Sequence, residues 1–268
     1  MEEDRVYDER RREFVAYVAS AAGVATVRVS SDRVGRFSLA ERCSARDAAA
    51  VADCVYLATD EGVLAGPDSF ELTGFGDAFG GAVAVGGAGD PIAASEDGRV
   101  ARLVDGEWEL AGSVADVRAI EADLVGAAGG VYRAEPDGLA AVGLADVRDV
   151  AANGAPLAAA DDGLYRLGNG WLREREGDFR TVAADADQAH AATAELLYVR
   201  VGDDWESVEL PTEESVAGVA YGENVYVVTT AGTFLVDADP ATTPDGAGGW
   251  RSRALGLPDV RAMAVVES

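Results

Sequence analysis

Few residues in this sequence have the types and spacing that enzymes use for acid–base or nucleophilic chemistry. The one histidine, His190, could act as a general base if Asp185 or Asp187 oriented its ring. No serine stands in a nucleophile-elbow motif and neither cysteine has a reactive context, so acyl transfer has little support. The chain also contains no lysine, which excludes Schiff-base, Ser-Lys and P-loop chemistry.

Adjacent carboxylates offer a second chemistry, the hydrolysis of a glycosidic bond or a lactone. The pairs Asp60-Glu61, Glu96-Asp97 and Asp161-Asp162 have the required residue types, and each stands directly before a glycine. With 48 acidic residues in the chain, adjacent acids are also expected as background. Because aspartate favours turn geometry, we interpret the pairs as exposed hairpin turns. We therefore predict no catalytic residue and expect no enzyme activity, with a lactonase- or glycosidase-type hydrolase kept as an alternative.

Metal ligands are similarly sparse. Asp185-Ala186-Asp187 and Asp237-Ala238-Asp239 offer oxygens to calcium, but neither matches a loop that supplies six or more ligands. Cys43 and Cys54 lack the two further ligands of a structural zinc site, and one disulfide would be unusual in a reducing cytosol. We predict no metal and no cofactor, and we interpret both cysteines as small buried apolar residues.

An arginine recurs at the start of the first strand in five copies of the repeat described below. The column consists of Arg46, Arg118, Arg148, Arg180 and Arg261. An aspartate stands two positions earlier in four copies: Asp116, Asp146, Asp178 and Asp259. Such a column could form a ring of arginine–carboxylate pairs between neighbouring units, or a binding site for an anion or a protein partner. The recurring aspartate favours the structural role.

The overall charge limits the possible partners. The 268 residues include 48 acidic and 22 basic residues, for a formal net charge of −26, while 49% of the chain is hydrophobic. These values indicate a folded domain with an acidic surface, which molar salt tolerates because the Debye length there is about 3 Å. The pattern is typical of proteins from salt-in halophilic archaea. No basic stripe is present to bind nucleic acid or an anionic membrane, so we expect neither partner.

A repeat runs along the chain. A glycine follows a short apolar segment and a turn at Gly23, Gly62, Gly98, Gly130, Gly163 and Gly232, and a seventh turn without glycine falls near Leu196. A large residue lies six positions before each of these glycines and before Leu196, at Tyr17, Tyr56, Ile92, Leu124, Leu157, His190 and Tyr226. Since six copies hold other large residues at the position of His190, we expect that histidine to pack in the core.

A second column opens a later strand of each unit with an aromatic or large residue. Its members are Phe37, Phe70, Trp108, Leu139, Trp171, Trp205 and Trp250, which include all four tryptophans. Each unit also begins with an introductory strand, as in Asp116–Ile120 and Asp146–Val150. Four strands in about 40 residues predict the blade of a β-propeller.

The two ends of the chain complete one blade. The N-terminal unit has strands at Phe14–Ser20, Val24–Ser30 and Phe37–Cys43 but no introductory strand, and residues 259–266 are an introductory strand with nothing after it. We therefore predict one all-β domain over residues 1–268, a seven-bladed propeller with four-stranded antiparallel blades whose ring is closed by the N- and C-terminal segments.

Residues 1–12 form a charged segment before the first strand. Arg11-Arg12 followed by an apolar stretch also looks like a twin-arginine export signal. The repeat assigns the same apolar stretch to a blade, so we expect a cytoplasmic protein. No apolar run approaches the about 20 residues that a membrane span needs.

Several segments resemble known propeller repeats. Gly163-Leu164-Tyr165-Arg166 with Gly170-Trp171, and the segment from Leu255 to Val265, are similar to repeats of the sialidase and photosystem-assembly-factor type. The full Asp-box is absent, since Ser95-Glu96-Asp97-Gly98 begins like one and then departs from it. As a whole the chain resembles a haloarchaeal propeller family of unassigned activity, so the resemblance implies the fold and no site residue.

Three functions remain open on these grounds. We expect a noncatalytic scaffold, most simply a monomer, that binds another protein on the channel face. A small anionic ligand held by the arginine column is the second possibility, and the hydrolase is the third. A broad apolar or aromatic patch on one face would favour the first, and free arginines that converge in the channel would favour the second. A bound divalent ion or close carboxylates in the channel would favour the third.

Overall fold

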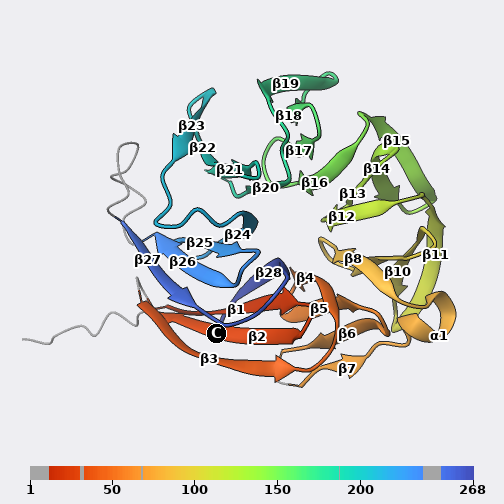
Figure 1. The fold of residues 1–268 in the computed structure, drawn as a ribbon. Helices are drawn as coiled ribbons and strands as arrows, with labels where there is room; N and C mark the ends of the chain where they lie inside the picture. The colour runs from red at the N-terminus through yellow and green to blue at the C-terminus, as the bar shows by residue number, and fades with distance from the viewer. Residues whose placement is uncertain (1–11, 31–32, 68, 187, 238–248) are drawn as a thin grey trace, which may run out of the picture.

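Seven antiparallel sheets form a ring around a central channel (Figure 1). The computed structural model describes residues 12–30, 33–67, 69–186, 188–237 and 249–268. Each sheet has four strands, and we number the sheets as blades 1 to 7 from the N-terminus. The prediction of a seven-bladed propeller with four-stranded blades is confirmed.

Blades 1 to 4 contain the following strands, from the channel outward. Blade 1 has β28 (Val260–Glu267), β1 (Glu13–Ser20), β2 (Gly23–Ser30) and β3 (Arg33–Glu41). Blade 2 has β4 (Ala45–Val51), β5 (Cys54–Thr59), β6 (Gly62–Gly66) and β7 (Glu71–Leu72). Blade 3 has β8 (Ala82–Gly86), β9 (Ile92–Ser95), β10 (Arg99–Val104) and β11 (Glu107–Ser113). Blade 4 has β12 (Val117–Glu121), β13 (Leu124–Ala127), β14 (Gly130–Glu135) and β15 (Gly138–Gly143).

Blades 5 to 7 follow the same order. Blade 5 has β16 (Val147–Ala151), β17 (Leu157–Ala160), β18 (Gly163–Leu167) and β19 (Trp171–Glu176). Blade 6 has β20 (Thr181–Ala184), β21 (Ala189–Ala192), β22 (Leu197–Val201) and β23 (Asp204–Val208). Blade 7 has β24 (Val216–Tyr221), β25 (Val225–Thr229), β26 (Thr233–Asp237) and β27 (Trp250–Ala254).

The second strand of each blade makes most of the core. Blades pack face to face, so both faces of this strand lose contact with water, and β9, β13, β17 and β21 are buried at every residue. The large residues predicted here pack accordingly, with Leu124, Leu157 and Tyr226 at most 1% exposed. Fourth strands such as β27 are largely exposed. The tryptophan column lies on these outer strands, as predicted.

The N- and C-terminal segments close the ring in blade 1. β28 pairs antiparallel with β1, with Phe14 opposite Glu267 and Tyr17 opposite Ala264. The backbone N–H of Ser268 adds a hydrogen bond of 2.9 Å to the carbonyl oxygen of Glu13. The predicted closure is therefore confirmed, and the apolar stretch after Arg12 is strand, as the repeat required.

The hairpin turns explain both the glycine column and its one exception. Gly130 has φ +136°, and a Cβ there would lie 2.5 Å from the carbonyl oxygen of Leu144, so only glycine fits. In blade 6, the Oγ1 of Thr193 accepts hydrogen bonds from the backbone N–H groups of Glu195 and Leu196. Leu196, which stands in the glycine column, does not have a positive φ, so this turn does not require glycine.

Three details differ from the sequence predictions. The outer strand of blade 1 spans Arg33–Glu41 rather than Phe37–Cys43. A short helix, α1 (Phe75–Phe79), follows β7 and was not predicted. No helix of the described residues is long and apolar enough to span a membrane. Cys43 and Cys54 are half-buried free thiols rather than buried ones; Cys43 lies in the connection between β3 and β4, and Cys54 is the first residue of β5. The Sγ of Cys54 lies 2.7 Å from the carbonyl oxygen of Gly66.

Candidate functional site

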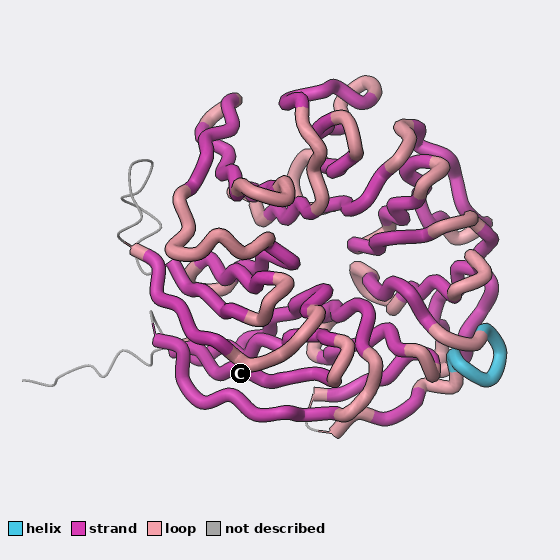
Figure 2. The backbone as a smooth tube through the Cα atoms, in the orientation of Figure 1, coloured by secondary structure: helices cyan, strands magenta, loops and turns pink. Residues whose placement is uncertain are grey.

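The inner strands of the seven sheets lie around the centre of the ring (Figure 2). Residues from β28, β4, β8, β12, β16, β20 and β24 line a cavity of about 490 Å³. This volume lies within the range typical of ligand pockets. The channel is therefore the first place to look for a site.

All five predicted arginines line this cavity, and we call them the arginine mouth: Arg46, Arg118, Arg148, Arg180 and Arg261. Four of them share one backbone feature. The strand pairing skips Arg46, Arg118, Arg148 and Arg261, so each is the extra residue of a β-bulge in its inner strand. A bulge turns the side chain out of the regular alternation, and here it directs each guanidinium to the channel edge of the next blade.

The bulged arginines tie neighbouring blades through backbone carbonyl groups. Arg118 donates to the carbonyl oxygen of Val147 at 3.2 Å, and Arg148 donates to that of Phe179 at 3.4 Å. The same contact joins Arg46 to Ala82 at 3.4 Å and Arg261 to Ala45 at 3.5 Å. In each case the acceptor stands at the start of the next blade's inner strand, so four arginines contribute to the ring itself.

Carboxylates approach the arginine mouth from two directions. Asp116 pairs with Arg118 of its own blade at 2.8 Å, whereas Asp178 of blade 6 pairs with Arg148 of blade 5 and lies 3.7 Å from Arg180. Arg46 pairs with Glu96, which lies in the next blade.

The recurring aspartate therefore serves its own arginine in two copies and not in the other two. Asp146 and Asp259 have no ion pair with an arginine of the mouth among the described residues. Both have φ +50°, a left-handed conformation that aspartate tolerates better than most residues. Turn geometry accounts for the residue type at these two positions, and the Asp-x-Arg pattern gives a local ion pair in two of its four copies.

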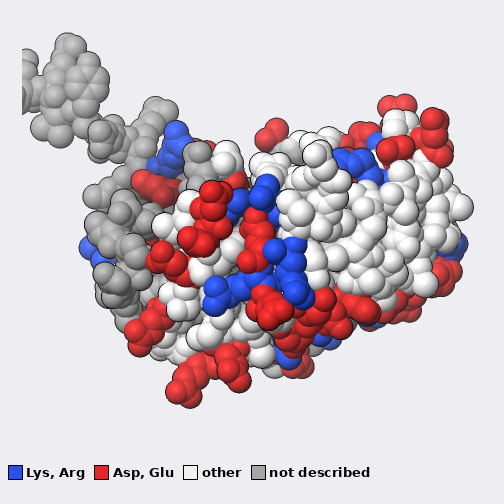
Figure 3. Space-filling model, turned by 90° about the horizontal axis from the view of Figure 1, so that it is seen from above, with Lys and Arg blue, Asp and Glu red and all other residues white. Residues whose placement is uncertain are grey.

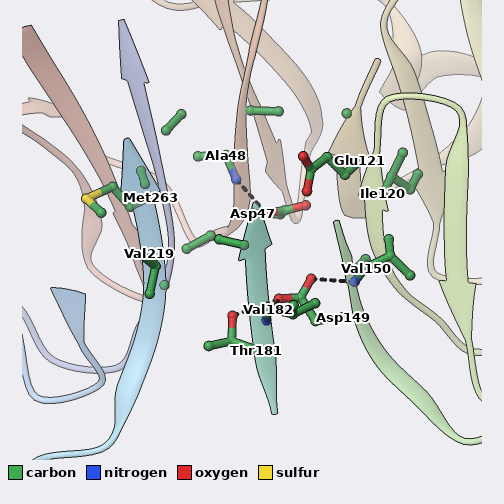
Figure 4. Close-up of a pocket in the computed structure, with 18 of the residues that line it drawn as sticks. Asp47, Ala48, Ile120, Glu121, Asp149, Val150, Thr181, Val182, Val219 and Met263 are labelled. Atoms are coloured by element: carbon green, nitrogen blue, oxygen red, sulfur yellow. Dashed lines mark hydrogen bonds between the residues drawn. The ribbon is translucent and has the colours of Figure 1, made fainter. Parts of the chain in front are cut away.

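Three carboxylates that line the channel, Asp47, Glu121 and Asp149, were not predicted from the sequence (Figure 4). Asp47 on β4 accepts the backbone N–H groups of Ala48 and of Val85 in the next blade, at 2.8 and 2.9 Å. Asp149 on β16 similarly accepts the N–H groups of Val150 and Val182, both at 2.9 Å. Asp47 and Asp149 directly follow Arg46 and Arg148, so reading the arginine column one position further would have found them.

Burial shifts the titration of these carboxylates. Each is half-buried among the inner strands that line the channel. Desolvation raises the pKa of Asp47 to about 7, of Asp149 to about 6 and of Glu121 to about 8. Hydrogen bonds from backbone N–H groups lower the pKa of each one in part, and the charge of Asp149 raises those of Asp47 and Glu121.

His190 lies in the core of blade 6, as predicted, and is 4% exposed. The Tyr221 hydroxyl donates to the carbonyl oxygen of Ala183 at 2.9 Å, which uses its single proton. Tyr221 therefore accepts the hydrogen bond of 3.0 Å from His190, whose Nδ1 carries a proton. Burial lowers the pKa of His190 to about 4, so the ring is neutral at pH 7 and serves as a hydrogen-bonded core residue. Asp187 lies outside the described residues, and so does Asp239.

The three acid pairs occupy hairpin turns on the same face as the arginine mouth, and we call them the acidic collar: Asp60, Glu61, Glu96, Asp97, Asp161 and Asp162. The loops that lead into inner strands contact these hairpins, as in the hydrogen bond of 3.0 Å from Phe179 N–H to the carbonyl oxygen of Ala160. All six residues are exposed. Hydrogen bonds from Arg99 and Ser95 lower the pKa of Asp97 to about 2.

Charge is mixed along the side of the ring as well. In the space-filling view, acidic side chains border much of the visible surface and arginines gather in a band beside them (Figure 3). Glu174 on β19 illustrates the pairing: it binds Arg166, lies 3.5 Å from Arg200 and accepts the Nε1–H of Trp205 at 2.8 Å. These contacts join blades 5 and 6 at their outer strands. Among the described residues, no group of histidine, cysteine and acidic side chains could hold a metal ion.

Comparison with known families decides the classification. The family model "Beta-prop_HVO_0234:-like, beta propeller" matches residues 1–266. The chain belongs to this family. The expected membership of a haloarchaeal propeller family is thus confirmed, and it establishes the fold rather than an activity. No curated protein sequence matches the chain.

Solved propellers share the fold at low sequence identity. A chain of the nidogen/laminin complex has a TM-score of 0.60 and 8% identity, covering 94% of this chain and 98% of that one. Apo AztD from Citrobacter koseri has a TM-score of 0.56 and 10% identity, covering 96% and 98%. YCF48 bound to D1 peptide has a TM-score of 0.55 and 14% identity, covering 74% and 76%. At these identities the similarity concerns the fold alone.

Proposed function

We propose that this propeller is a noncatalytic scaffold that binds another protein on the face carrying the arginine mouth. One observation carries the proposal: five arginines line one end of the channel in a chain whose net charge is −26, and four of them donate to carbonyl oxygens of the next blade. They therefore form a fixed arginine-rich surface rather than a set of free anion ligands. Arginine is enriched at the centres of protein interfaces because its planar guanidinium makes several hydrogen bonds and packs on apolar surface.

The channel carboxylates favour a structural role over hydrolysis. Asp47 and Asp149 each hold backbone N–H groups of two inner strands, so their oxygens satisfy donors that the sheet edge would leave unpaired. The histidine lies in the core rather than in the channel. These placements support binding without catalysis.

Two structural relatives are complexes by name, YCF48 with D1 peptide and nidogen with laminin. They support the use of a propeller as a protein-binding platform, although their low identity transfers no residue. The acidic surface supports work in the concentrated salt of a halophilic archaeal cytoplasm, where screening reduces the repulsion among carboxylates.

A small anionic ligand is the second candidate. The cavity of about 490 Å³ is large enough for one, and the arginine mouth supplies the donors. Such a ligand would lie within the channel, whereas a protein partner would also cover the surrounding hairpins.

Affinity capture from a molar-salt lysate of the source cells tests the proposal. The bait is the full chain, compared with an Arg180→Gln/Arg261→Gln variant and with Arg28→Gln, whose arginine lies on β2 away from the channel. We expect one protein to be retained by the parent and by Arg28→Gln but lost from the double variant. A protein captured equally by all three baits, or none at all, would contradict the proposal.

A further inference from the structure

We infer that the arginine mouth binds a carboxylate at the tip of a basic segment of the partner. This inference rests on the proposed function, because it specifies the chemistry of the same surface. It follows from the arrangement of charge on this face, where five arginines line the channel entrance and exposed carboxylates lie on the hairpins around it. The channel carboxylates Asp47 and Asp149 are already bonded to backbone N–H groups.

At the mouth, guanidinium groups outnumber the carboxylates that pair with them. Four of the five arginines make ion pairs with three carboxylates, Glu96, Asp116 and Asp178, and Arg261 makes none among the described residues. Arg180 and Arg261 are held most weakly. Arg180 has an exposed fraction of 52% and only the 3.7 Å contact with Asp178, whereas Arg46, Arg118 and Arg148 are 25–32% exposed.

Arg261 likewise keeps unused donors. Among the described residues its side chain makes one hydrogen bond, of 3.5 Å, to the carbonyl oxygen of Ala45. A carboxylate accepts hydrogen bonds from guanidinium groups in a planar, often bidentate geometry. Of the five arginines, Arg180 and Arg261 therefore use the fewest of their donors within the described residues, which leaves the most for a ligand.

The mouth has room between these two arginines. They belong to blades 6 and 1, and blade 7 lies between them. At the bulge position of blade 7 stands Ala217, followed by Gly218, and both line the cavity. Small residues therefore leave space at the place where other blades carry an arginine, and a narrow tip can enter there.

The outer charge selects what surrounds that tip. The acidic collar carries exposed carboxylates on the same face, and Glu96 of the collar contacts Arg46 of the mouth. A wholly acidic segment would meet repulsion at the collar, and a wholly basic one would meet it at the mouth. A carboxylate flanked by basic residues complements both.

Binding of labelled peptides to the full chain in molar KCl tests the inference by fluorescence anisotropy. The reference probe is a short arginine-rich peptide whose glycine-rich tip carries one aspartate. Matched probes replace that aspartate with asparagine, move the carboxylate to a free C-terminus, or amidate that terminus. An acidic peptide without arginines, and citrate and phosphate as competitors, complete the set.

We expect the asparagine probe to bind about 10-fold more weakly than the aspartate probe, the size of one lost charge-assisted hydrogen bond. The Arg180→Gln/Arg261→Gln variant should remove this preference, and Arg28→Gln should keep it. A preference for the aspartate probe over the asparagine probe indicates a side-chain carboxylate. A preference for the free C-terminus over the amidated one indicates a terminal carboxylate. Because changing the probe leaves the protein intact, this comparison stands even if a variant folds poorly.

Equal affinity for the acidic and neutral tips would overturn the inference. Tight binding of the wholly acidic peptide would overturn it as well. So would displacement of the reference probe by citrate or phosphate at concentrations similar to that of the unlabelled reference peptide needed for the same displacement. If lysate capture still depends on Arg180 and Arg261 while the tip preference is absent, the proposed function stands and this inference fails. If capture is independent of the mouth, the proposed function fails.

Discussion

Arg148 at the start of β16 forms an ion pair with Asp178 before β20, so a carboxylate of blade 6 holds a guanidinium of blade 5. The same arginine donates to the carbonyl oxygen of Phe179 at 3.4 Å. Arg180 shares Asp178 at 3.7 Å but makes no side-chain hydrogen bond among the described residues. Neighbouring arginines of one column thus differ in how firmly the fold holds them.

This difference predicts unequal effects of two matched substitutions. Arg148→Ala removes a bridge between blades and should lower the free energy of unfolding by about 1–2 kcal/mol. Arg180→Ala should change it by less than about 0.5 kcal/mol, since it removes only a long, exposed contact. Urea unfolding in molar KCl measures both, and an Arg148→Ala variant as stable as its parent would refute the structural role of the bulged arginines.

Deleting residues 259–268 should open the ring. The deletion removes β28, the inner strand of blade 1, and exposes the edge of β1 that β28 covers. We expect a lower thermal midpoint in molar KCl and association of the truncated chains through the exposed edge. Thermal unfolding and size-exclusion chromatography test this; an unchanged midpoint together with an unchanged elution volume would show that closure is dispensable.

Dilution of salt should destabilise the fold. The chain carries 48 acidic and 22 basic residues, and the screening length grows from about 3 Å in molar salt to about 30 Å at 0.01 M. Repulsion among carboxylates then reaches across the molecule. We expect the melting temperature to fall progressively on dilution from molar KCl, and a constant value would contradict adaptation to salt.

The channel carboxylates predict that stability falls as pH rises from 6.5 to 8. Burial holds the pKa of Glu121 at about 8 and of Asp47 at about 7, far above the unfolded values near 4. In this interval the folded state binds more protons than the unfolded state, so each rise in pH favours unfolding.

His190 has the opposite effect on stability at lower pH, where its protonation favours unfolding. The pKa of His190 is about 4 when folded and about 6.5 when unfolded, so its contribution is complete above pH 6.5 and is lost as pH falls toward 4. Glu121→Gln should therefore flatten the decline between pH 6.5 and 8 without altering the effect of His190. Urea midpoints across pH 4 to 8 measure both, and an identical slope in the variant would show that Glu121 does not titrate in this interval.

The repeat made the fold predictable, whereas several details of the site were not. Glycine turns, buried second strands and the outer tryptophans recur because every blade solves the same packing problem, so the column of Arg46 and Arg148 was visible in the sequence. The bulges that direct these arginines leave no clear mark in the residue types. Asp47 and Asp149 were missed because single acids do not stand out among 48. Asp116, Asp146 and Asp259 all have a left-handed backbone, yet only Asp116 pairs with the arginine two positions later, so the residue type at this position does not predict the ion pair.

The short helix and the cysteines show a further limit. Phe75 and Phe79 lie one helical turn apart with stacked rings, and Phe75 also contacts Trp108 edge-on. Five residues are too few for a periodic pattern, so packing against blade 3 rather than local sequence places this helix. The partial exposure of Cys43 and Cys54 similarly follows from their places in a connection and at a strand start, which residue type does not reveal.

Hydrogen exchange of the full chain, with and without the protein that it captures in molar KCl, tests the central claim most directly. If the partner binds at the arginine mouth, protection should increase in the starts of β4, β12, β16, β20 and β28 and in the hairpins of the acidic collar. The turns on the opposite face, such as residues 105–106 and 202–203, should exchange as before. Protection confined to the opposite face or to the outer strands would contradict the proposed binding surface.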